Sequence, residues 1–321
     1  MTSEQSFDVV IIGGAMMGSS LAWWLSDMGF GGRVAVIERD PSYEFSSTAR
    51  TNSCIRQQFS SEINIRISQF GAEFIHGFHE RIGDPEAPQL KIQSFGYMYL
   101  AGSEKAAAAL RTSHAAQVAC GAATRLMTPD EIGAEYPFYN LEGVVLGSHN
   151  PVDEGYFDGA TIFDWWRKIA KRRGVSYLTG EVTGLTRAGN RITGVTLADG
   201  TRIACGMVVN AAGPRAATIA GMAGLEIPIE PRRRYTYIFD AAEPLGQDLP
   251  LTIDPSGVHM RTDGRYYLCG CPPFHDHAMA FDDFSEEPGI WEEKLWPALA
   301  HRVPAFERIK VIRSWVGHYA Y

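Results

Sequence analysis

A glycine-rich loop and a carboxylate near the N-terminus are the residues with the clearest chemical meaning in this sequence. The loop runs from Gly13 to Gly18 (GGAMMG), and Glu38 lies 20 residues beyond its last glycine. Glycines allow a tight turn, and backbone N–H groups at a helix start favour the negative charge of a pyrophosphate. A carboxylate at this spacing can accept hydrogen bonds from an adenosine ribose and disfavours a 2′-phosphate. The pattern therefore predicts a dinucleotide site.

The elements that position these residues are contained in the same stretch. Residues 7–12 (FDVVII) are typical of a strand buried on both faces, 19–28 of a helix, and 33–38 (RVAVIE) of the next strand. Strand, glycine loop, helix and a strand ending in Glu38 together indicate a Rossmann-type βαβ unit. Ala15 replaces the second glycine of the usual fingerprint, which weakens the match slightly. A simple flexible loop between core elements would not explain why Glu38 is in register.

The second half of the chain predicts further elements. Residues 155–174 contain an amphipathic helical segment. Strand signals at 175–178, 181–185, 191–197 and 207–210, separated by turn residues, predict a β-meander that ends at Ala211-Ala212-Gly213. Strands such as 95–100 and 234–239 predict a separate sheet, with loops at 241–250 and 272–288.

Three segments carry a resemblance to a known family. They are the Gly13–Gly18 loop with Glu38, residues 47–59 (STARTNSCIRQQF) and residues 209–213 (VNAAG). With them the chain resembles the D-amino-acid oxidase-like FAD oxidoreductases, which include sarcosine oxidase, glycine oxidase and dimethylglycine dehydrogenase. The runs at 56–60 and 302–307 are similar to the branch that contains a mitochondrial complex I assembly factor.

The resemblance implies FAD as the cofactor and an α/β fold (α+β overall). It pairs a Rossmann-type FAD-binding domain and its β-meander with a second, antiparallel-sheet substrate domain. The implied FAD-binding domain comprises 1–92, 151–219 and 311–321, and the substrate domain 93–150 and 220–310. The implied cofactor-binding residues are Gly13, Gly14, Ala15, Met16, Met17, Gly18, Glu38, Arg39, Ser47, Thr48, Arg50, Ser53, Cys54, Val182, Ala211, Ala212 and Gly213.

The implied reaction is hydride transfer from a C–H bond next to an amine nitrogen onto flavin N5, which gives an imine that hydrolyses. A guanidinium suits the carboxylate of a small amine or amino-acid substrate, and Arg56 and Arg261 are the candidates for it. Tyr97, His259 and Tyr267 are weaker candidates for polar contacts with the substrate. Catalytic residues cannot be named. Two alternatives stay open: an assembly factor or catalytically compromised FAD-binding homologue, and a 2-hydroxy-acid oxidase or dehydrogenase.

Two features bear on turnover. Sarcosine oxidase-like relatives place a lysine over the flavin for reaction with oxygen, whereas no lysine occurs here between Lys171 and Lys294. The electron acceptor is therefore oxygen or another carrier. Relatives also continue past the equivalent of Tyr321 with a segment that covers the flavin, so we expect a fragment, a partner subunit or homo-oligomer, or poor FAD binding.

Composition narrows the class of protein. The net charge is −8 with basic residues scattered along the chain, which argues against a nucleic-acid partner. No apolar run approaches the roughly 20 residues of a membrane span, and no secretion signal precedes residue 7. The five cysteines lack the spacing of a zinc site, which predicts free thiols in a cytoplasmic protein. Cys54 is expected to be a small packed residue rather than a reactive one. His275-Asp276-His277 fits a solvated loop better than a metal site.

Overall fold

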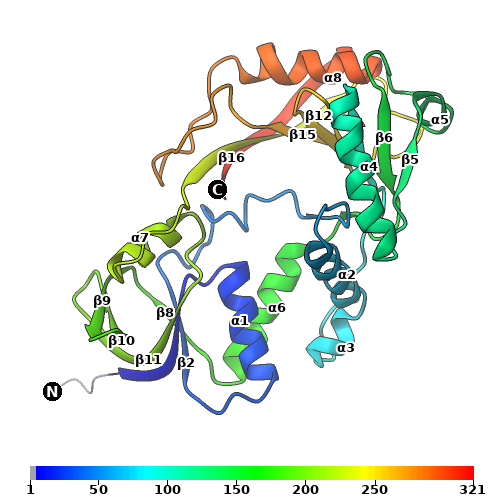
Figure 1. Ribbon diagram of the computed structural model, residues 1–321. Coiled ribbons are helices and arrows are strands. Elements are labelled where there is room, and N and C mark those ends of the chain that lie inside the picture. Colours follow the sequence, from blue (N-terminus) through cyan, green and yellow to red (C-terminus); the bar gives the residue numbers. More distant parts are fainter. Residues whose placement is uncertain (1–4) are drawn as a thin grey trace.

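Two β-sheets organise the molecule, one in the lower and one in the upper part of Figure 1. The structure is a computed structural model that describes residues 5–321. The first sheet has six strands in the order β8-β2-β1-β11-β10-β9. Its strands are β1 (Gln5–Ile12), β2 (Val34–Glu38), β8 (Ser176–Thr179), β9 (Val182–Ala188), β10 (Arg191–Leu197) and β11 (Arg202–Asn210).

Strand β1 lies at the centre of this sheet, parallel to β2 on one side and β11 on the other. Val9 and Ile11 pack with α1 (Met16–Asp27) and α6 (Gly159–Arg172) on one face. Val10 and Ile12 pack with α7 (Ala216–Met222) on the opposite face. Because side chains alternate along a strand, a strand covered on both faces has to be apolar throughout, as the sequence predicted.

The predicted β-meander is only partly correct. β9, β10 and β11 are antiparallel neighbours, whereas β8 pairs in parallel with β2 at the opposite edge of the sheet. The reason is that the chain reaches β8 through the crossover helix α6. This helix begins after Asp158, whose Oδ1 atom accepts the Thr161 N–H at 3.0 Å. A crossover helix returns the chain parallel to the strand beside which it lands.

The second sheet has eight strands in the order β16-β12-β15-β14-β13-β4-β6-β5. All neighbouring pairs are antiparallel except β13 and β4. Its strands are β4 (Tyr97–Ala101), β5 (Arg125–Met127), β6 (Leu146–Asn150), β12 (Pro231–Ala241), β13 (Leu251–Ile253), β14 (His259–Asp263), β15 (Tyr266–Cys271) and β16 (Ile309–Ala320).

Helices cover the second sheet, and a third, two-stranded sheet pairs β3 with β7. Figure 1 shows α8 above β12 and β15, with α4 beside β6. The core between them contains aromatic side chains, with the Phe239 and Phe306 ring centres 5.0 Å apart. The remaining elements are α2 (Glu62–His76), α3 (Phe78–Ile82), α4 (Glu104–Ala119), α5 (Pro129–Glu135), α8 (Trp296–Arg302), β3 (Cys54–Ile55), β7 (Gly155–Tyr156), η1 (Gly213–Arg215), the π-helical η2 (Ile290–Leu295) and η3 (Pro304–Glu307). Within residues 5–321, no helix is long and apolar enough to cross a membrane.

Strand β16 pairs within the second sheet and also contacts residues that follow the first sheet's strand β2. The sequence assigned residues 311–321 to the first domain, but β16 pairs with β12 along its whole length and Val316 lies in the core of the second sheet. β16 also contacts the segment that follows β2. Ser47 Oγ donates to the His318 carbonyl at 2.6 Å, and Trp315 Nε1 donates to the Arg50 carbonyl at 3.1 Å.

Candidate functional site

The glycine loop is compressed against the end of β11. Gly13 has φ +98°, and a Cβ there would lie 2.4 Å from the Ala211 carbonyl oxygen. A Cβ at Gly18 would lie 1.9 Å from the Gly13 oxygen. The N-cap residue of α1, Ala15, makes no side-chain hydrogen bond, and Thr48 accepts the Met16 N–H, which leaves the other N–H groups of the first turn to face an anion. The close backbone contacts at Gly13 and Gly18 leave no room for a side chain at either position.

Glu38 lies beside this loop, as its spacing predicted. Its Oε2 atom accepts the Gly14 N–H at 2.8 Å, and its Oε1 atom accepts the Asp40 N–H at 2.9 Å. Thr48 Oγ1 accepts the Met16 N–H at 3.2 Å, which brings the segment after β2 against the helix start. Carboxylate, hydroxyl and backbone donors thus converge where β1 and β2 end.

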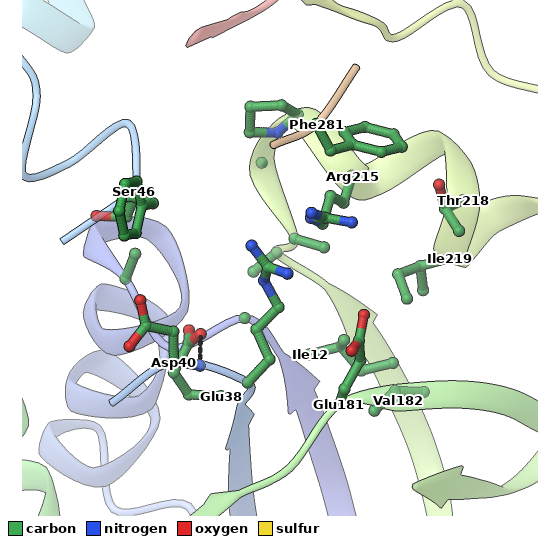
Figure 2. A pocket seen from close by; sticks show the side chains of 18 of the residues that line it. Ile12, Glu38, Asp40, Ser46, Glu181, Val182, Arg215, Thr218, Ile219 and Phe281 are labelled. Atoms are coloured by element: carbon green, nitrogen blue, oxygen red, sulfur yellow. Dashed lines mark hydrogen bonds between the residues drawn. The ribbon is translucent and has the colours of Figure 1, made fainter. Parts of the chain in front are cut away.

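These groups surround a cavity of about 430 Å³. Figure 2 shows Glu38 and Glu181 on its two sides, with Arg215 pointing into it and Phe281 above. The predicted cofactor residues that line it are Gly13, Ala15, Met17, Glu38, Arg39, Ser47, Thr48, Val182, Ala211, Ala212 and Gly213. The predicted residues that do not line it are Gly14, Met16, Gly18, Arg50, Ser53 and Cys54.

One wall of the cavity was not predicted from the sequence. Phe281 and Phe284 come from residues 272–288, which the sequence showed only as a loop. Asp282 in this loop accepts a hydrogen bond from Arg215 Nη2 at 2.7 Å and lies 3.9 Å from Arg39 Nη2. Burial, and next the charge of Arg39, lower the pKa of the Arg215 guanidinium. Arg215 could have been found, because it directly follows the Ala211–Gly213 motif and Pro214.

Arg56 belongs to the 47–59 segment but does not line the cavity, and it lies among aromatic rings. Its guanidinium carbon is 4.5 Å from the Phe59 ring centre and 5.9 Å from those of Tyr97 and Tyr99. Within residues 5–321, its Nε atom is buried without a hydrogen-bond partner, and no carboxylate oxygen lies within 4.0 Å of its guanidinium nitrogens. Arg56 is therefore a partly buried cation free to pair with an anion.

Arg261 is in a different situation. It is 3% exposed, and Nη1 donates to Asp263 Oδ1 at 2.7 Å while Nη2 donates to the Asn52 carbonyl at 3.3 Å. Asn52 Nδ2 lies 2.9 Å from His259 Nε2. Burial, followed by the nearby Arg261 charge, lowers the pKa of His259 to about 4, so the imidazole is neutral at pH 7. Arg261 is already paired and fixes the 52–54 segment, a weaker anion site than Arg56.

Two other predicted residues differ in their surroundings. Cys54 and Tyr97 are close together near Arg261, and burial raises the pKa of the Cys54 thiol to about 11, so it stays protonated. Tyr267 is not brought to this cluster. Its hydroxyl accepts the Leu245 N–H at 2.8 Å, and its ring lies 4.7 Å from that of Phe306 in the core of the second sheet. A substrate contact by Tyr267 has no support in this arrangement.

A family model described as "FAD dependent oxidoreductase" (DAO) matches residues 8–321. The chain belongs to the DAO family of FAD-dependent oxidoreductases. This DAO-family chain is 35% identical to the Xenopus laevis FAD-dependent oxidoreductase domain-containing protein 1, over 98% of this chain and 70% of that protein. It is also 23% identical to the Rhodobacter capsulatus sarcosine oxidase subunit beta, over 98% of this chain and 74% of that subunit.

Solved structures support the same fold for the DAO-family chain. L-proline dehydrogenase from P. horikoshii superimposes with a TM-score of 0.83 at 26% identity, covering 99% of this chain and 82% of that one. Since the family is FAD-dependent, the fit of its cofactor can be tested against the residues described above. The start of α1, where the N-cap residue Ala15 makes no side-chain hydrogen bond, suits the pyrophosphate of FAD together with the closely packed glycines, and the Glu38 carboxylate suits its ribose.

Replacing Arg215 by alanine in the DAO-family chain is expected to weaken FAD binding about tenfold. The substitution removes one of two guanidinium groups at the cavity and the partner that holds Asp282, and with it the 272–288 loop. Fluorescence of FAD released on dilution would measure the loss. Arg202→Ala, at an exposed position of β11, is the matched control. Equal FAD retention in both variants would contradict the assignment.

Proposed function

We propose that this chain is an enzyme that oxidises the C–N bond of a secondary amine or an amino acid, with FAD as its cofactor. The observation that carries the proposal is the Arg56 guanidinium, which lies in an aromatic setting with no carboxylate oxygen of the described residues within 4.0 Å of its nitrogens. A planar guanidinium binds a carboxylate through two parallel hydrogen bonds, so a substrate with a carboxylate suits this position.

We further assign the cofactor contacts to the residues around the cavity. Gly13, Glu38 and Thr48 would hold the ADP half of FAD, and Val182 and Ala211–Gly213 would flank it. In this proposal the first sheet with its helices is the cofactor domain, and the second sheet is the substrate domain. β16 belongs by its pairing to the second sheet. The segment 47–59, which leads from the cavity to Arg56, joins the two sites.

The names of two relatives support the substrate class. Sarcosine and proline, which occur in the names of a relative and of a solved structure, are both secondary amines that carry a carboxylate. When bound, FAD accepts the hydride lost by the carbon next to the amine nitrogen. In this chain, Arg56 would orient the carboxylate, while Tyr97 and the neutral His259 would line the space around the amine. Arg261 would fix His259 through Asn52.

The direct test is the visible absorption spectrum of the FAD-loaded chain under anaerobic conditions. N-methyl amino acids, proline, D-amino acids and 2-hydroxy acids would be added one at a time. We expect the flavin bands to bleach with one of the amine substrates. Bleaching only with a 2-hydroxy acid would reassign the substrate class. Spectra unchanged by every compound would overturn the proposal and favour a non-catalytic role for the FAD-binding chain.

The electron acceptor can be identified with the same preparation. No lysine lies between Lys171 and Lys294, and Lys294 Nζ donates a hydrogen bond to the Pro272 carbonyl at 2.8 Å. We therefore propose a carrier other than oxygen as the main acceptor. Substrate-reduced protein is expected to be reoxidised faster by an artificial electron-accepting dye than by air. Rapid reoxidation in air alone would identify an oxidase.

A further inference from the structure

A buried carboxylate lies directly behind the Arg56 segment. Glu154 is 0% exposed and follows β6. Its Oε1 atom accepts the Gln57 N–H at 2.6 Å and the Asn150 amide at 3.0 Å. Its Oε2 atom accepts the Gln58 amide at 3.0 Å. All three partners are donors, so these hydrogen bonds favour the ionised carboxylate, whereas burial disfavours it.

The charged and titratable groups around Glu154 come from several elements. Arg56, on the segment after β3, attracts its negative charge. Tyr97 and Tyr99 on β4 are influenced by both Glu154 and Arg56, and burial raises the pKa of each phenol, so both stay neutral. The adjacent carboxylate, Asp153, turns to the surface and pairs with His76 at 2.7 Å. Arg56 is thus the cation that acts on Glu154.

These opposing effects leave Glu154 poised between its two forms. Burial raises the pKa of Glu154 to about 7, against the opposing effects of the Gln58, Gln57 and Asn150 hydrogen bonds and of Arg56. At neutral pH a substantial part of the population is ionised and offsets the charge of Arg56. A substrate carboxylate on Arg56 would place a second anion beside the same cation. Repulsion in a buried setting then favours protonation of Glu154.

We propose that Glu154 is the counter-charge of Arg56 and takes up a proton when an anionic carboxylate occupies the guanidinium. The inference rests on the proposed function, because it assumes that Arg56 anchors the substrate. Glu154 acts through Arg56 and through the 57–58 backbone that it holds, so it is a positioning residue. Below pH 7 Glu154 is already protonated and binding needs no proton. Above pH 7 binding must draw a proton from solvent, so carboxylate affinity falls as pH rises.

The test measures binding rather than turnover. Propionate, which is anionic over the whole range and has no amine, is titrated into the FAD-loaded protein by calorimetry between about pH 6 and about pH 9. Buffers of different ionisation enthalpy count the protons taken up. We expect affinity about tenfold weaker at the upper pH, which corresponds to a shift of one pKa unit, and proton uptake near neutral pH. Neutral propionamide should bind without pH dependence.

Variants separate the possible results. Glu154→Gln is expected to remove both the pH dependence and the proton uptake, while Asp153→Asn, the neighbouring surface carboxylate, should keep both. If Glu154→Gln does not fold, the proton count in the unmodified protein decides. Propionate binding that requires Arg56 but shows no proton uptake would overturn this inference alone. Propionate binding that is equal in Arg56→Ala at every pH would overturn the proposed function and this inference together.

Discussion

Gly18→Ala is expected to weaken FAD binding strongly. The added Cβ would lie 1.9 Å from the Gly13 oxygen and 3.2 Å from a side-chain methyl group of Ile11. Gly13 cannot retreat, because it is itself pressed against the Ala211 carbonyl. The clash is relieved only if α1 moves away from β1, which displaces the N–H groups at its start. Overpacking of this kind costs about 2 to 3 kcal/mol, which weakens FAD binding roughly 30- to 150-fold.

The measurement is the FAD content of the purified chain, followed by titration of the cofactor-free protein with FAD. Gly31→Ala is the matched control, since a Cβ there meets no heavy atom of the described chain within 4 Å and its φ is not left-handed. It should bind FAD as the unmodified chain does. A Gly18→Ala protein with full FAD content would show that the close contact between loop and helix is not needed for the cofactor.

Arg56→Ala is expected to cause the largest loss in substrate turnover. Truncating one partner of a buried, hydrogen-bonded charge pair costs about 2 to 5 kcal/mol, which corresponds to a fall in kcat/KM of roughly 30- to several thousand-fold. Arg56→Lys keeps the charge but loses the planar fork, so we expect an intermediate loss. FAD content should not change, because Arg56 does not line the cofactor cavity.

Steady-state kinetics with the substrate found in the spectral screen would measure this effect. Arg66→Ala is the control, because Arg66 forms an exposed ion pair with Glu62 on α2 and such pairs contribute little. Thermal unfolding of each variant would show whether the fold is intact. Unchanged kinetics in Arg56→Ala would move the carboxylate anchor to another residue, with Arg261 the next candidate.

The fold predictions that succeeded depend on local sequence. The βαβ unit with Gly13, Gly18 and Glu38 spans fewer than 40 residues, and its strands, loop and helix each show their own pattern. The hairpin between β9 and β10 is likewise set by the Gly189-Asn190 turn. The position of β8 could not be read locally. Whether a short apolar strand continues a meander or crosses to the far edge depends on how the preceding helix packs.

In the candidate site, too, some features could be predicted from local sequence and others depended on the tertiary structure. Sequence by itself identified the family, and it predicted the glycine loop, Glu38 and Arg56 as site residues, because each lies in a short motif whose residue types have a physical reason. Only the tertiary structure separated Tyr267 from Arg261. Arg261 faces the 52–54 segment, whereas Tyr267 is registered opposite Thr262 and therefore lies on the other face of the sheet.

Tertiary structure alone also brought in the 272–288 loop and Glu154. These residues reach the site from distant parts of the chain, through the order of the strands and the direction in which each side chain points. Glu154 carries no motif, and its meaning comes from three donors and one cation that long-range packing places around it. Short motifs fix local chemistry, whereas the charge state and partners of a buried group depend on neighbours that only the folded chain supplies.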